Sequence, residues 1–139
     1  MIEGEHVTYV GQVSIEERCE LMAKARAVIC PTLYVEPFGG VAVEAMMCGT
    51  PVLSTDWGAF AETVIPGVSG YRFQTLQDGL DGLQACDLLD PAAVRLHALD
   101  HYSLDAVGPR FDRWLDRLDT LNGEGWYQRD ADRSLAGVA

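Results

Sequence analysis

Short runs of β-branched and apolar residues alternate along the chain with longer segments of helical periodicity. Residues 7–10, Val-Thr-Tyr-Val, are β-branched and aromatic and are followed by a glycine, as is typical of a strand. Residues 27–30 are apolar throughout and stop at Pro31, which favours a parallel strand covered on both faces. Two later runs, at residues 51–55 and 71–73, bring the expected strands to four.

The segments between and after these runs predict helices. Ser14 and Glu17 have the spacing of a capping box, so we expect a helix that begins after Ser14 and continues to about residue 27. A second helix is expected from Gly39 or Gly40 to Cys48, with Gly49 ending it. Further helices are expected at residues 59–64, 76–89, 91–101 and 104–121.

This alternation predicts an α/β fold, a partial Rossmann-like parallel sheet with helices on both faces. We expect one domain over residues 1–121. Over residues 122–139 Gly, Asp and Arg replace the periodic apolar positions, which predicts a loosely ordered C-terminal tail. Ligands on such sheets bind beyond the carboxyl ends of the strands. The expected binding rim is therefore formed by residues 11–14, 31–40 and 55–62.

The charge of the chain narrows its range of partners. Its 139 residues include 10 Lys and Arg against 21 Asp and Glu, a formal net charge of −11, so nucleic acid and anionic membrane surfaces would be repelled. Neither a membrane span nor a secretory signal is expected from the apolar runs and the acidic first residues. The four cysteines form no Cys-x-x-Cys pair, which favours free thiols and a cytoplasmic location.

Residues 35–47 carry the chemistry of the expected rim. Glu36 and Glu44 are eight residues apart, and Gly39 and Gly40 lie between them where the second helix is expected to begin. The free amides and the positive dipole end of a helix attract an anion. Glu44 lies about one turn into the helix, and its side chain tilts back towards that end. An anion site between two carboxylates fits a sugar nucleotide, whose diphosphate is flanked by hydroxyl groups.

The same residues resemble the signature of retaining glycosyltransferases of the GT-B fold, the large group 1 or family 4 class. The similarity rests on Glu-Pro-Phe-Gly-Gly-Val-Ala-Val-Glu-Ala-Met at residues 36–46. Four flanking motifs follow the order of that class, and they lie at residues 9–14, 25–32, 48–55 and 58–70. The similarity covers about residues 7–121 and corresponds to the C-terminal, donor-nucleotide domain, with its first strands missing.

The resemblance implies a role for each matching position. Glu36 would contact hydroxyls of the donor sugar, as the candidate catalytic residue, and Glu44 would bind the ribose hydroxyls. Main-chain atoms at Val13 would border the base. Backbone amides would hold the sugar and the diphosphate at Phe38, Gly39, Gly40 and Val41. The donor would be a UDP-, GDP- or ADP-sugar, the anomeric configuration would be retained, and no cofactor or tightly bound metal would be needed.

The sequence also departs from a complete enzyme of this class. By comparison with that class, we expect the acceptor domain and the start of the donor domain to be missing, and no basic residue lies between Arg26 and Arg72. We therefore expect a truncated domain, or half of a split enzyme, that does not turn over a donor alone. Alternatively, the chain is a non-catalytic binding or interaction module derived from such an enzyme.

The missing strands would leave unpaired edges, which favour association. We expect residues 7–10 either to pair beside the remaining strands or to be exchanged between two chains. The expected partners are therefore a second copy, as a homodimer or swapped oligomer that completes the sheet, or a separate acceptor domain.

Three side-chain groups leave alternatives open. His97 and His101 are four residues apart on an expected helix and could face a metal ion together, but no third ligand has a suitable spacing, so surface histidines are favoured. Trp57 and Phe60 either wall the sugar pocket or pack over the edge of the sheet. Glu62 is expected to belong to the loop that shapes the site rather than to contact the ligand.

Overall fold

The computed structural model describes residues 4–124, with side chains up to residue 119. The described chain divides into two compact units, one ending at Tyr102 and the other beginning at Ser103. The first unit contains the sheet, five helices and every candidate site residue. The second unit contains helix α6 (Leu104–Glu124).

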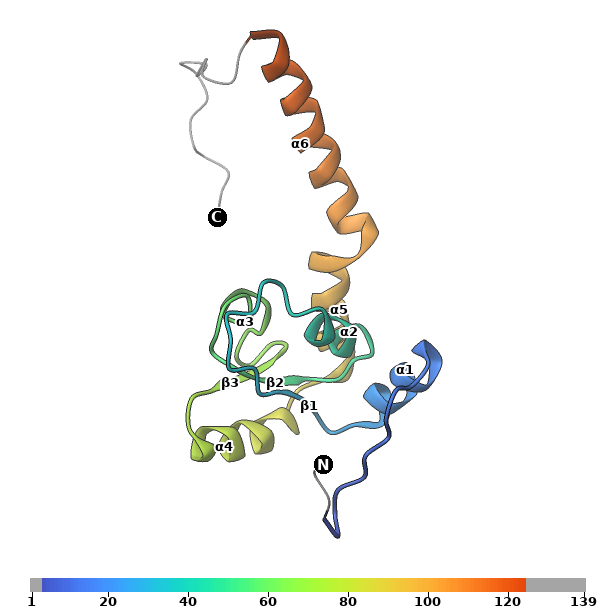
Figure 1. Ribbon diagram of the computed structural model, residues 1–139, viewed down its shortest axis with the longest axis vertical. Helices are drawn as coiled ribbons and strands as arrows, with labels where there is room; N and C mark the ends of the chain where they lie inside the picture. Colours follow the sequence, from blue (N-terminus) through green and yellow to red (C-terminus); the bar gives the residue numbers. More distant parts are fainter. Residues whose placement is uncertain (1–3, 125–139) are drawn as a thin grey trace. The chain divides into compact units, whose positions relative to one another are not determined.

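Three parallel strands form the sheet of the first unit (Figure 1). They are hydrogen-bonded in the order β1 (Val28–Cys30), β2 (Val52–Thr55) and β3 (Gly70–Phe73). All four residues of β2 are buried, as expected for a central strand covered on both faces. The α/β class, the parallel sheet and three of the expected strands are therefore confirmed.

Helices cover both faces of this sheet. Val52 joins an apolar core with residues of α2 (Gly40–Met47) and α5 (Pro91–Tyr102). Leu53, the next residue along β2, faces α4 (Leu76–Cys86). Its Cδ1 packs so close to Gly82 of that helix that a Cβ added at Gly82 would lie 2.8 Å from it. Successive residues of a strand point to opposite faces, and Figure 1 shows α4 on one side of the sheet and α2 and α5 on the other.

Burial fixes helix α2, whose first turn carries the candidate site. Four of its eight residues are buried, and Ala42, Ala45 and Met46 are fully so. The short helix α3 (Phe60–Thr63) adds Phe60, which is among the largest fully buried side chains of the described residues. Burying a methionine or phenylalanine side chain contributes about 1.5–3 kcal/mol. The start of α2 is therefore held by packing beneath it.

Helix α1 (Ile15–Lys24) begins at the expected capping box. The Glu17 amide donates to the Ser14 hydroxyl at 3.1 Å, and the Ser14 amide donates to the Glu17 carboxylate at 2.9 Å. The helix ends at Lys24 rather than near residue 27, because Ala25 is already extended and leads into β1. Thr50 ties this helix to the end of α2 by donating its hydroxyl to the Met22 carbonyl at 2.6 Å.

The prediction of a strand at residues 7–10 is wrong. Val7, Tyr9 and Val10 are exposed, and the described part of this segment forms only an isolated bridge between Gly4 and Val7. A strand is held by hydrogen bonds to a neighbour. Over residues 4–124, the sheet that these residues were expected to join consists of β1, β2 and β3. Pairing of residues 7–10 beside the remaining strands is therefore contradicted, whereas exchange between two chains stays a prediction.

Helix α6 forms the described part of the second unit. Phe111, Trp114 and Leu115 are exposed along it, and Phe111 and Trp114 border a hollow of about 340 Å³ together with Val107 and Arg110. The helix continues past residue 121 to Glu124, so the first residues of the expected tail are helical, while residues 125–139 lie outside the described residues. Among the described helices, none has the length and apolarity needed to cross a membrane.

Candidate functional site

The candidate site lies where β1 ends and α2 begins. A cavity of about 380 Å³ opens there, between the end of β1, the following loop and the first turn of α2. It is lined by Ile29, Cys30, Thr32, Tyr34, Glu36, Gly39, Gly40, Val41 and Phe60. This is the carboxyl end of a strand, the position at which open parallel sheets bind ligands.

Gly39 begins helix α2 in a backbone conformation that favours glycine. Its φ is +77°, and a Cβ at this position would lie 2.6 Å from the buried ring of Phe60. The Gly39 carbonyl accepts the amide of Ala42 at 2.9 Å and that of Val43 at 3.3 Å, which closes the first turn.

Two backbone donors remain open at this turn. In the described part of the chain, the amides of Gly40 and Val41 make no hydrogen bond, since they precede the first residue that can bond within the helix. Both residues line the cavity. The positive end of the α2 dipole is therefore presented to whatever enters it.

The Glu36 carboxylate already occupies part of this anion-binding position. Its Oε1 accepts the amide of Gly39 at 3.0 Å and that of Phe38 at 3.5 Å. A hydrogen bond from the Tyr34 hydroxyl lowers the pKa of Glu36, and the two amides lower it further. The same interaction with Glu36 raises the pKa of Tyr34. Glu36 is thus an ionised acceptor held at the wall of the cavity.

The loop after β2 supports Glu36 from behind. Ala59 donates its amide to the Glu36 carbonyl at 2.8 Å, so the rims that follow β1 and β2 are joined. Gly58, with φ +63°, leaves no room for a side chain, because a Cβ there would lie 2.5 Å from the Glu36 amide nitrogen. Phe60 lines the cavity and is also buried in the core cluster, while its expected place at a sugar stays a prediction.

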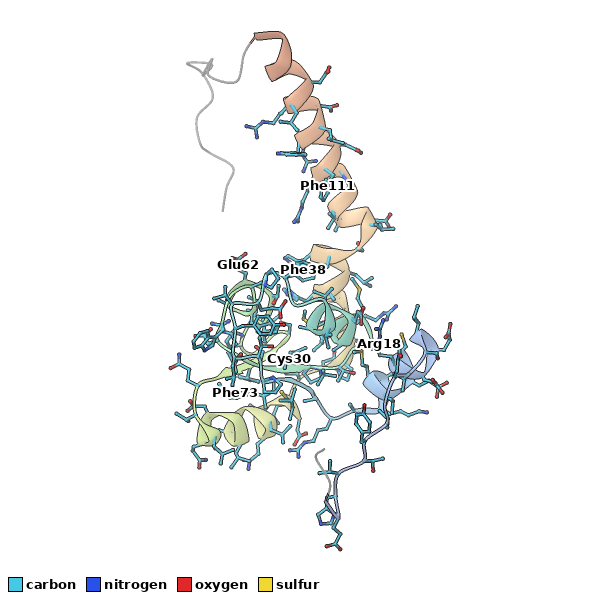
Figure 2. The ribbon with its side chains drawn as sticks, in the orientation of Figure 1. Arg18, Cys30, Phe38, Glu62, Phe73 and Phe111 are labelled. Atoms are coloured by element: carbon cyan, nitrogen blue, oxygen red, sulfur yellow. The ribbon has the colours of Figure 1, made fainter. Side chains whose placement is uncertain are left out.

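Glu44 lies one turn further along α2, where it is paired with a residue that the sequence did not single out. Arg18 of α1 donates through Nη2 to Glu44 Oε1 at 3.2 Å, and its Nε lies 3.2 Å from Oε2. Figure 2 shows Arg18 on the side of α1 towards α2. The pair spans 26 positions in sequence, and no local pattern predicts an ion pair between two helices.

The structure brings some expected site residues together and leaves others apart. Glu36, Gly39, Gly40 and Val41 line one cavity, and the Phe38 amide joins them through Glu36. Glu44 is not among the residues that line this cavity. Val13 borders a separate hollow of about 390 Å³ beside α1, together with Val10, Glu17, Glu20, Leu21 and Lys24.

Another arginine at the rim is occupied by a structural contact. Arg72 of β3 forms an ion pair with Asp56 at 2.7 Å and donates to the carbonyl of Val64 at 2.5 Å. These contacts hold the end of α3 against the sheet. The guanidinium is therefore committed to the loop after β2.

The histidine pair on α5 is not part of a metal cluster among the described residues. The rings of His97 and His101 lie 4.4 Å apart, and His101 Nδ1 is 2.8 Å from the His97 carbonyl. Burial lowers the pKa of His97, and the neighbouring His101 lowers it further. Tyr102 links this pair to the ring of Phe38, which it meets edge to face at 6.3 Å.

Comparison with known proteins identifies the family. The model of the family described as glycosyl transferases group 1 matches residues 3–78. The chain is 37% identical over 123 residues to phosphatidyl-myo-inositol mannosyltransferase of Mycobacterium leprae, covering 84% of this chain and 33% of that protein. It is 35% identical over 74 residues to α-maltose-1-phosphate synthase of Mycobacterium tuberculosis, covering 53% of this chain and 19% of that protein.

A solved structure agrees with these relatives. The crystal structure of AviGT4, a glycosyltransferase involved in avilamycin A biosynthesis, superposes with a TM-score of 0.68 at 26% identity, covering 78% of this chain and 35% of that one. The chain thus spans about a third or less of the length of these proteins. It belongs to the group 1 glycosyl transferases, and its α/β unit has their GT-B, Rossmann-like fold.

Proposed function

We propose that this chain binds the nucleotide-sugar donor of a retaining glycosyltransferase reaction. The observation that carries the proposal is the pair of open amides at Gly40 and Val41, set in a cavity at the start of α2 with the Glu36 carboxylate in its wall. Amides at a helix start suit the diphosphate. Glu36 accepts hydrogen bonds from hydroxyls of the sugar, and Glu44, one turn away, accepts those of the ribose.

The same arrangement favours departure of the nucleoside diphosphate. As the bond to the anomeric carbon breaks, negative charge grows on the leaving oxygen. The amides of Gly40 and Val41 are fixed by the packing of α2, so they stabilise that charge without reorganising. The ionised Glu36 lies on the sugar side, where positive charge develops at the anomeric carbon.

We propose further that the chain alone does not complete the transfer. No Lys or Arg is among the described residues that line the cavity, and the two nearby arginines, Arg18 and Arg72, are paired with Glu44 and Asp56. Much of the electrostatic stabilisation of a diphosphate leaving group would then come from elsewhere. An acceptor site would also come from another domain or chain, in keeping with the greater length of the relatives.

An interaction module is the second candidate function. The exposed apolar side chains of Val7, Tyr9 and Val10 and the exposed Ile29 at the outer strand β1 favour it. Such a surface suits strand exchange with another chain. This module would bind a partner without holding a donor in the cavity.

Titration of the full chain by calorimetry separates the two functions. UDP, GDP and ADP and their hexose derivatives are each added to the wild type and to Glu44→Ala. We expect one base to bind at a single site and the variant to lose about tenfold in affinity, since the ribose hydroxyls lose a charged acceptor. Absence of binding by every nucleotide would contradict donor binding and favour the interaction module.

A further inference from the structure

The contact between Arg18 and Glu44 joins the start of α2 to α1. Each Glu44 carboxylate oxygen has one guanidinium nitrogen at 3.2 Å. The Arg18 and Glu44 side chains are 42% and 45% exposed, but Arg18 Nε and Glu44 Oε2 are themselves buried and form no hydrogen bond among the described residues. Helices α1 and α2 are in contact, and the Thr50 hydroxyl fixes their spacing through Met22.

Two other carboxylates of α1 have partners of their own, so Arg18 pairs with Glu44. Glu17, the adjacent carboxylate on α1, is held by the capping box at Ser14. Glu20 is paired with Lys24 at 3.1 Å on the same helix. Arg18 therefore lies across from one carboxylate, and that carboxylate is the one to which the proposed function assigns the ribose.

We propose that Arg18 is a positioning residue that fixes Glu44 so that its Oε1 accepts the 2′-hydroxyl of a ribonucleotide donor. The inference rests on the proposed function and adds a residue to it. A carboxylate has about four acceptor positions. Arg18 Nη2 occupies one position on Oε1 through a hydrogen bond, and Arg18 Nε lies 3.2 Å from the buried Oε2 as an ion-pair contact. A second position on Oε1 stays open, and a ribose hydroxyl can fill it.

The pair also lowers the electrostatic penalty of placing a carboxylate close to a diphosphate. Arg18 and Glu44 together carry no net charge, so the ribose meets an oriented acceptor without an unpaired negative charge beside the phosphates. Without Arg18, the Glu44 side chain is free to rotate and its charge repels the diphosphate. A change in the orientation of Glu44 affects recognition of the 2′-hydroxyl. Repulsion between Glu44 and the diphosphate lowers the affinity for every nucleoside diphosphate equally.

The test compares ribose and 2′-deoxyribose nucleotides on the full chain. Calorimetry gives the dissociation constant of whichever of UDP, GDP and ADP binds most tightly, and of its 2′-deoxy counterpart. The proteins are the wild type, Arg18→Gln, Arg18→Lys, Glu44→Ala and the double variant Arg18→Gln with Glu44→Ala. Lys24→Gln is the matched control, because it removes a positive charge and an ion pair from the same helix. Thermal melting shows that each variant is folded.

We expect the wild type and Lys24→Gln to favour the ribonucleotide by about tenfold. Arg18→Gln and Glu44→Ala should each bring that ratio below about threefold. Arg18→Lys should have a ratio between those variants and the wild type. The double variant should have the same ratio as Glu44→Ala. A ratio in Arg18→Gln equal to the wild type, with a reduced ratio in Glu44→Ala, would overturn the role of Arg18 alone. Absence of nucleotide binding by the wild type would overturn the proposed function and this inference with it.

Discussion

Replacing Gly58 with alanine should destabilise the protein by about 2–5 kcal/mol and displace Glu36. Gly58 has φ +63°, where a residue with a Cβ is strained by about 1–2 kcal/mol. The new Cβ would also lie 2.5 Å from the Glu36 amide nitrogen and 3.0 Å from the Glu36 carbonyl carbon. Backbone atoms cannot move aside as a flexible side chain can, so a further 1–3 kcal/mol is expected from overpacking. Urea denaturation at equilibrium measures the loss.

Gly67→Ala is the matched control for this substitution. Gly67 has φ +77°, but a Cβ there would meet nothing within 4 Å. Gly67→Ala should therefore lose about 1–2 kcal/mol of stability, from backbone strain alone. Equal losses in Gly58→Ala and Gly67→Ala would show that the loop after β2 does not press on Glu36 as the structure indicates.

The second large effect is expected for Glu36→Gln on the affinity for the donor. The amide oxygen of glutamine can still accept the Gly39 and Phe38 amides, so the loop should keep its conformation. The negative charge that the sugar hydroxyls would meet is lost, which corresponds to about tenfold or more in affinity. The loss should affect the nucleotide sugar and spare the free nucleoside diphosphate, and calorimetry with both ligands measures it.

Glu62→Gln is the matched control for the loss of negative charge in Glu36→Gln. Glu62 is an exposed carboxylate on α3, outside the residues that line the cavity. It should bind both ligands as the wild type does. If the two variants lose affinity equally, or if Glu36→Gln weakens the free diphosphate as much as the nucleotide sugar, Glu36 does not contact the sugar.

Much of the sheet and most helix starts were predictable because local chemistry specifies them. The capping box at Ser14, the glycine that ends α2 and the apolar run of β1 act over a few residues each. The segment at residues 7–10 has equally good strand residues, yet it is exposed and unpaired in the sheet. Strand propensity describes a side chain that fits a sheet, and a neighbouring strand has to be present for one to form.

The candidate site was predictable in its backbone and less so in its charges. The pattern of Glu36, Gly39 and Gly40 is local, and the structure places all three at the cavity. Arg18 was missed because its partner is set by how α1 and α2 pack. The support of Glu36 by Ala59 likewise depends on two loops that follow different strands. Long-range contacts of this kind require the fold before they can be inferred.

An amide-resolved NMR titration of the full chain with a nucleotide sugar tests most directly whether the start of α2 binds the donor. If the start of α2 holds the diphosphate, the backbone amides of residues 38–41 should show the largest saturable shift changes, with Gly40 and Val41 foremost because their donors are open. The amides of α4, on the opposite face of the sheet, should stay unchanged. Saturable shifts that centre on α4 or elsewhere, with Gly40 and Val41 unmoved, would contradict the site.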